Sequence, residues 1–222
     1  MKAWSTSAQP WHIGLWVFII ALSLTSTATS AQTWRGLRVA PEARCSPYSP
    51  DDYRYPQSVE PRIIDSLGGI WSPYTGQSFA SRRETDIEHI VARSEAHDSG
   101  LCAASAPTRR QFATDLLNLT LASPSVNRGQ KSGHDAVGWL PDQNRCWFAD
   151  RIVQVRRKYQ LTIDREEADV LDHILDSCSS TALVRTPSAV SPVASGLPAS
   201  DLPDDIAQWD DNGNGRITCA EA

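Results

Sequence analysis

Short segments of different periodicity follow one another in the middle of the chain, and their order constrains the fold most. Residues 85–92 (TDIEHIVA) and 118–122 (NLTLA) interleave apolar and polar side chains, which predicts two short strands. Residues 106–117 are typical of a helix, and residues 123–130 begin with Ser-Pro, a common helix entry. Strand, helix, strand and helix in this order predict an α+β domain.

Two further helices are predicted after this region. Residues 146–160 repeat apolar side chains at spacings of four and three, and so do residues 164–178, which begin with Asp164 and Glu167 at the spacing of a capping box. The first stripe consists of Phe148, Ile152, Val155 and Tyr159. These helices complete a domain over residues 81–178, and residues 32–80 are interpreted as its loop-rich lead-in with short strands. Residues 179–203, rich in Pro, Ser and Ala, are predicted to be a linker.

The N-terminus predicts export. Residues 13–24 (IGLWVFIIALSL) are too few for a typical membrane span and suit the apolar region of a signal peptide, with cleavage near Ala31. The alternative is an uncleaved membrane anchor. We therefore expect residues 1–31 to be a signal peptide, the mature protein to be secreted or periplasmic, and no stable membrane association after cleavage.

Export also determines how the five cysteines are interpreted. Outside the cytosol they should form disulfides, and the odd number leaves one over. Cys146 and Cys178 stand at the start of one predicted helix and the end of the next, so an antiparallel hairpin would pair them. Cys45 with Cys102 is the other pairing we expect, which leaves Cys219. The chain has no CxxC pair, so a structural zinc site has little support.

Charge is distributed unevenly. Residues 82–160 carry a net charge of +3 and residues 161–222 a net charge of −9. A polyanion-binding core beside a cation-binding tail is one interpretation, and a solvated surface is the other. The basic run of Arg151, Arg156, Arg157 and Lys158 leaves the same choice between phosphate contacts and the solvent face of a helix.

The stretch at residues 86–91 (DIEHIV) carries the groups that phosphodiester hydrolysis requires. A histidine near its usual pKa can take a proton from water, and a carboxylate can hold a hard divalent cation. Adjacent residues of a regular strand point to opposite faces, so Glu88 and His89 can converge only if the strand ends or bulges there.

DIEHIV followed by DLLNLTLASPSVNRGQK resembles the ββα-metal motif of HNH endonucleases. The resemblance is greatest to the secreted branch that includes the GmrSD-type C-terminal domain, and it covers about residues 60–178. The Asn-Arg-Gly run also resembles the HNH domain of RNA-guided nucleases. By this resemblance His89 is the general base, and Glu88 and Asn127 bind Mg²⁺ or another divalent ion.

Further roles follow from the same resemblance. Asn118 would orient the His89 ring through a hydrogen bond, and Arg128 would contact phosphate. Asp86 would support the metal ligands. The alternatives are ordinary: a Glu-His pair is common, Asn118-Leu119-Thr120 is also a glycosylation sequon, and Asn127 could cap a helix. His97 is interpreted as structural or substrate-facing.

The C-terminal module, residues 204–222, fits a calcium loop at each key position. It resembles the excalibur calcium-binding module of extracellular bacterial proteins. The alternative is an acidic, glycine-rich tail without a bound ion. The expected Ca²⁺ ligands are Asp210, Asn212, Asn214, Arg216, Thr218 and Glu221.

Together these features predict an exported, metal-dependent HNH endonuclease that cleaves nucleic acid with little sequence specificity. Double-stranded DNA is the expected substrate and RNA the alternative. A second hypothesis is an extracellular calcium-binding or surface-attachment protein whose nuclease core is inactive. A toxin effector is a third, although no delivery domain is evident. Nothing in the sequence determines the oligomeric state.

Overall fold

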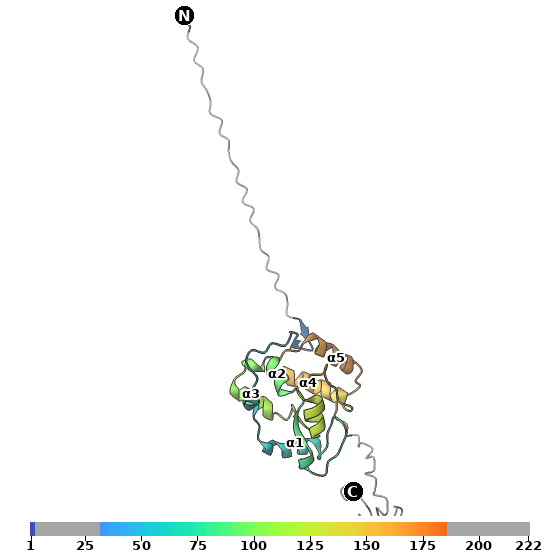
Figure 1. The fold of residues 1–222 in the computed structure, drawn as a ribbon. Coiled ribbons are helices and arrows are strands. Elements are labelled where there is room, and N and C mark those ends of the chain that lie inside the picture. Colours follow the sequence, from blue (N-terminus) through green and yellow to red (C-terminus); the bar gives the residue numbers. More distant parts are fainter. Residues whose placement is uncertain (3–31, 186–222) are drawn as a thin grey trace, which may run out of the picture. The chain divides into compact units, whose positions relative to one another are not determined.

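The computed structural model describes residues 1–2 and 32–185, and Figure 1 shows helices α1 to α5 in one folded body. The expected calcium loop, most of the expected linker and residues 3–31 of the expected signal peptide lie outside the described residues. In the described part of the chain, no helix is both long enough and apolar enough to cross a membrane.

The two predicted central strands form an antiparallel ribbon. Strand β3 (Asp86–His89) pairs with β4 (Leu119–Ala122), with Glu88 opposite Thr120 and His89 opposite Leu119. A seven-residue π-helix, η5 (Ser125–Lys131), follows β4. The expected ββα arrangement of an α+β fold is therefore present. However, β3 ends at His89 and does not continue to residue 92 as predicted.

The lead-in over residues 32–80 contains a helix that the sequence reading did not predict. Helix α1 (Glu60–Leu67) has a proline in its first turn and ends at Gly68, whose φ of 68° is the left-handed conformation that glycine adopts easily. It packs against β4. The other elements up to β3 are short: β1 (Thr33–Trp34), β2 (Leu37–Arg38), η1 (Pro50–Tyr53), η2 (Gln57–Val59) and η3 (Arg82–Glu84).

The chain between the two strands of the ribbon forms three helical elements, which are α2 (Arg93–Asp98), η4 (Leu101–Ala103) and α3 (Ala106–Thr114). Helix α3 was predicted, although it ends three residues earlier than expected. Ser105 caps α3 by accepting a hydrogen bond from the backbone N–H of Thr108. This long connection brings Phe112 and Ala113 into the core beside the end of β3.

The predicted helical hairpin is present as α4 (Arg145–Tyr159) and α5 (Arg165–Asp176). Asp164 caps α5 by accepting a hydrogen bond from the backbone N–H of Glu167. The expected disulfide between Cys146 and Cys178 closes the hairpin. The expected pair of Cys45 with Cys102 joins the lead-in to η4. Both pairings are confirmed.

Two groups of buried apolar residues hold these elements together. The larger surrounds α4, where Phe148, Ile152 and Val155 are buried as their spacing predicted. Each Å² of apolar surface removed from water stabilises the fold by about 25 cal/mol, so such a stripe is the main source of stability in helix packing. The smaller group lies between α1 and the ribbon and consists of Val59, Ile63, Ile87, Leu119 and Leu121.

The basic run on α4 corrects one interpretation. Arg156 is fully buried and pairs with Glu95 at 2.6 Å and with Glu167, so it belongs neither to a solvent face nor to a phosphate-binding surface. Lys158 pairs with Asp115. Arg157 and Lys158 are exposed on α4, and Arg157 donates to the carbonyl of Arg35. Arg151 is half-buried and lies over the Trp147 ring. The correction therefore applies to Arg156 alone.

The first residues of the expected linker contact the body. The backbone N–H of Val184 donates to Asn144 Oδ1 at 2.9 Å, and the guanidinium of Arg185 lies 5.6 Å from the centre of the Trp71 ring. The packed part of the chain thus extends past the boundary at Cys178.

Candidate active site

A cleft of about 520 Å³ opens beside β3. Four of the five predicted nuclease residues line it, namely Glu88, His89, Asn127 and Arg128. The fifth, Asn118, does not. The cleft therefore gathers residues from β3 and η5, and its other walls come from the lead-in and α2, including Tyr48, Tyr55, Gln57 and Arg93.

His89 is the last residue of β3, and its side chain is 5% exposed. Its Nε2 lies 3.0 Å from the carbonyl oxygen of Ala113 on α3. Because a carbonyl only accepts hydrogen bonds, Nε2 carries the proton and the neutral ring leaves Nδ1 as the basic atom. The ring is also packed between Tyr55, edge-on at 5.0 Å, and Phe112, stacked at 6.3 Å. Its orientation is thus fixed on several sides.

The electrostatics of His89 favour the neutral ring. Burial is the largest cause, and the nearby charges of Arg93 and Lys131 add to it, so that the pKa of His89 falls to about 3. A histidine with so low a pKa is unprotonated at neutral pH. Nδ1 is therefore free to accept a proton, but a pKa this far below neutral makes the ring a weaker base than an ordinary histidine.

Asn118 has a different role from the one predicted. Its Oδ1 accepts from the backbone N–H of Val91 at 2.8 Å, and its Nδ2 donates to the carbonyl of Val91 at 3.1 Å. No hydrogen bond among the described residues joins Asn118 to the His89 ring. The expectation that Asn118 orients the ring is therefore wrong. It holds the backbone two residues beyond His89, and Ala113 orients the ring instead.

Glu88 faces a lysine that the sequence reading missed. Its side chain is 4% exposed, and Oε1 lies 2.8 Å from Nζ of Lys131, which also donates to the carbonyl of His89 at 2.9 Å. Despite this short ion pair, Oε1 has no hydrogen bond of good geometry in the described part of the chain. Burial raises the pKa of Glu88, and Lys131 opposes that rise. Lys131 ends η5 and was inconspicuous in the sequence because a lone lysine carries no pattern.

Asn127 and Arg128 both contact Asp86. Asn127 Nδ2 donates to Asp86 Oδ2 at 3.0 Å, a bond that does not use the amide oxygen. Arg128 donates to the two carboxylate oxygens of Asp86 from Nε at 2.7 Å and from Nη2 at 2.5 Å. Asp86 and Glu88 are two residues apart on β3 and so lie on the same face. The structure thus brings together Asp86, Glu88 and Asn127.

These residues fit a hard divalent cation. Carboxylate and amide oxygens are the ligands that Mg²⁺ prefers. Glu88 Oε1 already faces Lys131 Nζ at 2.8 Å, so a bound cation would share this carboxylate with the lysine. Glu88 and Asn127 are therefore suitable metal ligands, with Asp86 beside them.

His97 does not belong to the cleft. Its Nδ1 lies 2.8 Å from the hydroxyl of Tyr53, and its Nε2 lies 2.7 Å from the carbonyl of Ser46. The ring is fully buried. It fastens the lead-in to α2, which agrees with the structural interpretation and not with a substrate-facing one.

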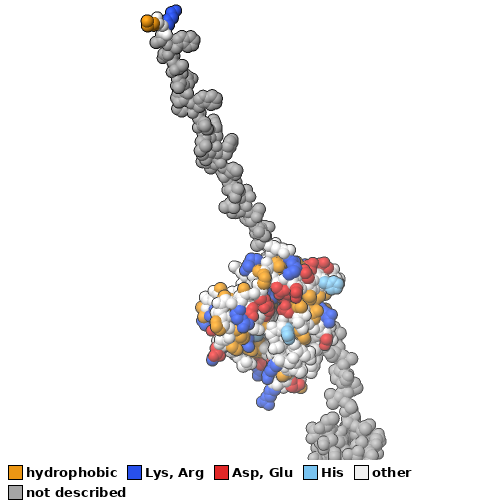
Figure 2. Space-filling model, turned by 45° about the horizontal axis from the view of Figure 1, so that its top comes forward, with side chains coloured by type: hydrophobic (Ala, Val, Ile, Leu, Met, Phe, Trp, Pro, Cys, Tyr) orange, Lys and Arg blue, Asp and Glu red, His pale blue; other side chains and the backbone are white. Residues whose placement is uncertain are grey.

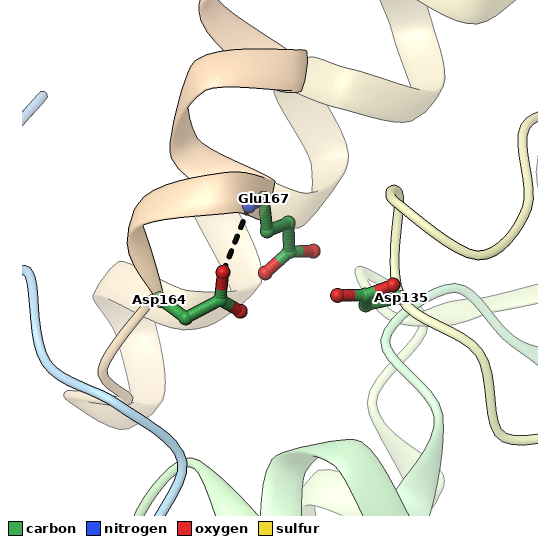
Figure 3. A group of neighbouring side chains, drawn as sticks. All are labelled: Asp135, Asp164 and Glu167. Carbon is green, nitrogen blue, oxygen red and sulfur yellow. Dashed lines mark hydrogen bonds between the residues drawn. The ribbon is translucent and has the colours of Figure 1, made fainter.

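A second group of acids lies at the start of α5. Asp164 and Glu167 point toward Asp135 from the neighbouring loop (Figure 3), and ligand oxygens of all three lie within 4.8 Å of one another. None of the three lines the cleft. Glu167 already pairs with Arg156, and burial raises the pKa of Glu167 to about 7. The sequence reading did not single out this group, whose members come from distant segments.

Acidic side chains also gather on the surface. Figure 2 shows Asp and Glu side chains in a patch on one face of the body, with Lys and Arg side chains around it. Near Glu95, a hydrogen bond with that carboxylate raises the pKa of Glu42 to about 8. The body therefore does not present a uniformly basic surface to a polyanion, although its middle segment carries a positive net charge.

The segment that builds this site matches a known nuclease family. Residues 66–174 match the family model described as GmrSD restriction endonucleases, C-terminal domain. The match spans both strands of the ribbon, η5, α4 and nearly all of α5, and it includes Glu88, His89, Asn118 and Asn127. A nuclease-like domain is what the match and the cleft both indicate.

One relative adds to this finding. The chain is 28% identical over 123 residues to a protein of Arthroderma benhamiae described as an uncharacterized secreted protein. The aligned part is 54% of this chain and 60% of that protein, so the chain spans under two thirds of its relative. No solved structure matches the chain significantly.

Proposed function

We propose that the protein is an exported, divalent-metal-dependent HNH endonuclease that hydrolyses phosphodiester bonds in DNA, with His89 as general base. The observation that carries the proposal is the arrangement in the cleft. A buried, neutral His89 lies at the end of the strand that also bears Glu88, and Asn127 approaches the same cleft from η5. The match to a restriction-endonuclease domain supports this assignment of the chemistry.

In the proposed reaction, Nδ1 of His89 removes a proton from a water molecule as the water oxygen attacks phosphorus. The bond from phosphorus to the leaving sugar oxygen breaks, and that oxygen gains a proton from solvent. Because Nε2 holds its proton against the Ala113 carbonyl, Nδ1 is the ring nitrogen left to act as the base. Positioning of this kind and proton transfer contribute about 10²–10⁴-fold in typical enzymes.

Glu88 and Asn127 would hold the cation, and Asp86 would fix the amide of Asn127. When bound, a divalent ion such as Mg²⁺ stabilises the charge that develops on the phosphate and the leaving oxygen. Lys131 holds the Glu88 carboxylate and the His89 carbonyl at once, so it keeps the ligand and the base at a fixed separation.

The decisive experiment uses the purified protein with supercoiled plasmid DNA and, separately, RNA, with Mg²⁺ or with a chelator. We expect metal-dependent nicking that is lost in His89→Ala. The matched control is His173→Ala, because His173 is exposed on α5 and does not line the cleft. If wild type and His89→Ala degrade neither substrate with any divalent metal tested, the proposal is wrong and the inactive binding protein becomes the better account.

Export is part of the proposal. Two disulfides in the described part of the chain and a relative described as secreted support an oxidising location. The calcium loop is tested separately by calorimetric titration of Ca²⁺ into the full-length protein and into Asp210→Ala/Glu221→Ala. We expect the double variant to lose the binding, and unchanged affinity would remove the calcium assignment.

A further inference from the structure

Arg93 and Arg128 both line the cleft, but only Arg128 has a carboxylate partner among the described residues. The guanidinium of Arg128 is already engaged by both carboxylate oxygens of Asp86. In the described part of the chain, Arg93 has no carboxylate within ion-pair distance. A phosphate entering the cleft would have to compete with Asp86 for Arg128, whereas it would meet no acidic competitor at Arg93.

Arg93 is held in place without being neutralised. Its Nη1 donates to the carbonyl of Tyr53 at 3.3 Å, and its guanidinium carbon lies 5.3 Å from the centre of the Tyr55 ring. Tyr55 in turn packs edge-on against His89. A guanidinium stacked on an aromatic ring keeps its edge available for a planar, two-point contact with an oxyanion. Arg93 is half-buried, so such a contact would be shielded from water.

The position of Arg93 along the chain supports the same role. It is the first residue of α2, four residues beyond His89, and Asn118 fixes the intervening backbone at Val91. His89, the proposed base, and the Arg93 guanidinium are therefore attached to one short, constrained segment. A phosphate held by Arg93 would keep a constant position relative to Nδ1 of His89.

We propose that Arg93 binds a non-bridging oxygen of the scissile phosphodiester and stabilises the charge that develops there. The inference rests on the proposed nuclease function and names the phosphate-binding group within it. The sequence resemblance assigned the phosphate contact to Arg128, and the present proposal assigns it to Arg93. The competing explanation is that Arg93 only packs against Tyr55 and thereby steadies the lead-in.

The test compares Arg93→Ala and Arg93→Lys with wild type on bis(4-nitrophenyl) phosphate, a substrate with a single phosphodiester, and on plasmid DNA. Loss of one well-placed donor to a transition-state oxyanion typically costs about 10²-fold or more in kcat. We expect Arg93→Ala to show a loss of that order on both substrates, and Arg93→Lys to lose less. Arg110→Ala is the matched control, since Arg110 is exposed on α3 and does not line the cleft.

Chemical rescue separates binding from packing. Free guanidinium ions at millimolar concentration should restore part of the activity of Arg93→Ala and leave Arg110→Ala unchanged. A packing residue would not be rescued in this way. Thermal unfolding of each variant shows whether it is folded, and Arg93→Lys keeps the test decisive if the alanine variant does not fold.

The outcomes distinguish the two proposals. If wild type is active, His89→Ala is inactive and Arg93→Ala keeps nearly full activity, the nuclease function stands and the role of Arg93 is refuted. A larger loss in Arg128→Ala than in Arg93→Ala, or a loss in Arg93→Ala that guanidinium does not rescue, also refutes it. If wild type cleaves neither substrate with any divalent metal, both proposals fail together.

Discussion

The contribution of Asn118 to the stability of the fold can be measured by mutation. Its side chain is fully buried and satisfies both backbone groups of Val91, the N–H at 2.8 Å and the carbonyl at 3.1 Å. Asn118→Ala removes both partners at once and leaves two buried backbone groups without hydrogen bonds. The same change releases the turn that follows His89, so stability and activity should both respond.

The magnitude follows from the cost of an orphaned polar group. Leaving one buried donor or acceptor unsatisfied costs about 1–3 kcal/mol, so two such groups give about 2–6 kcal/mol, and partial relaxation favours the lower half of that range. We expect Asn118→Ala to lower the free energy of unfolding by about 3 kcal/mol. We also expect a lower kcat in metal-dependent cleavage, because His89 would no longer be held at one distance from the ligands.

Urea denaturation followed by far-ultraviolet circular dichroism measures the first effect, and plasmid nicking measures the second. The matched control is Asn144→Gly. Asn144 also bonds two backbone groups, the carbonyl of Pro73 and the N–H of Val184, but it is partly exposed and outside the cleft. Glycine is used there because φ is 55°. A loss of under about 1 kcal/mol in Asn118→Ala would show that water replaces the lost bonds and would refute this reasoning.

Three other results are expected. The pKa of His89 is about 3 in the folded protein and 6.5 in the unfolded chain. The stabilisation that the neutral ring gives the fold is therefore complete above pH 6.5 and is lost as the pH falls. Between about pH 7 and 4, wild type should lose about 3 kcal/mol more free energy of unfolding than His89→Asn in urea titrations. The pH dependence from Glu167 has the opposite sign, because its folded pKa of about 7 lies above the unfolded value of 4.5. As the pH rises from about 4.5 to 7.5, wild type should lose about 3 kcal/mol of unfolding free energy relative to Glu167→Gln. Parallel plots of unfolding free energy against pH for the two proteins would contradict this. Cys146→Ser/Cys178→Ser opens a 32-residue separation and should lower the free energy of unfolding by about 3–4 kcal/mol; an unchanged melting temperature would contradict this.

The central ribbon and the helical hairpin could be predicted because their periodicities are local. Alternation over a few residues indicated β3 and β4, and the stripe of Phe148, Ile152 and Val155 indicated α4. The cysteine pair closing the hairpin followed from the ends of those helices. The boundary of β3 could not be predicted, since the bonds from Asn118 to Val91 that end the strand come from a residue distant in sequence.

The parts that could not be predicted depend on tertiary contacts. Helix α1 has a proline at its start and two glycines after it, which are local signals, but it lies in a stretch dominated by Pro, Ser and Tyr. Arg156 belongs to a basic run by sequence and is buried only because Glu95 and Glu167 reach it from other helices. Lys131 meets Glu88 only after the ribbon has formed. Side chains of this kind have no sequence signature.

The connection between β3 and β4 has a consequence for how such a domain can diverge. The proposed base and the proposed metal ligands belong to the ribbon and η5, yet the carbonyl that selects the tautomer of His89 is supplied by Ala113 of α3, inside the connection. A transplanted ribbon would therefore arrive with a misoriented base. An insertion that shifts Ala113 would remove the hydrogen bond that orients the His89 ring, and with it the proposed activity, while leaving every motif residue intact.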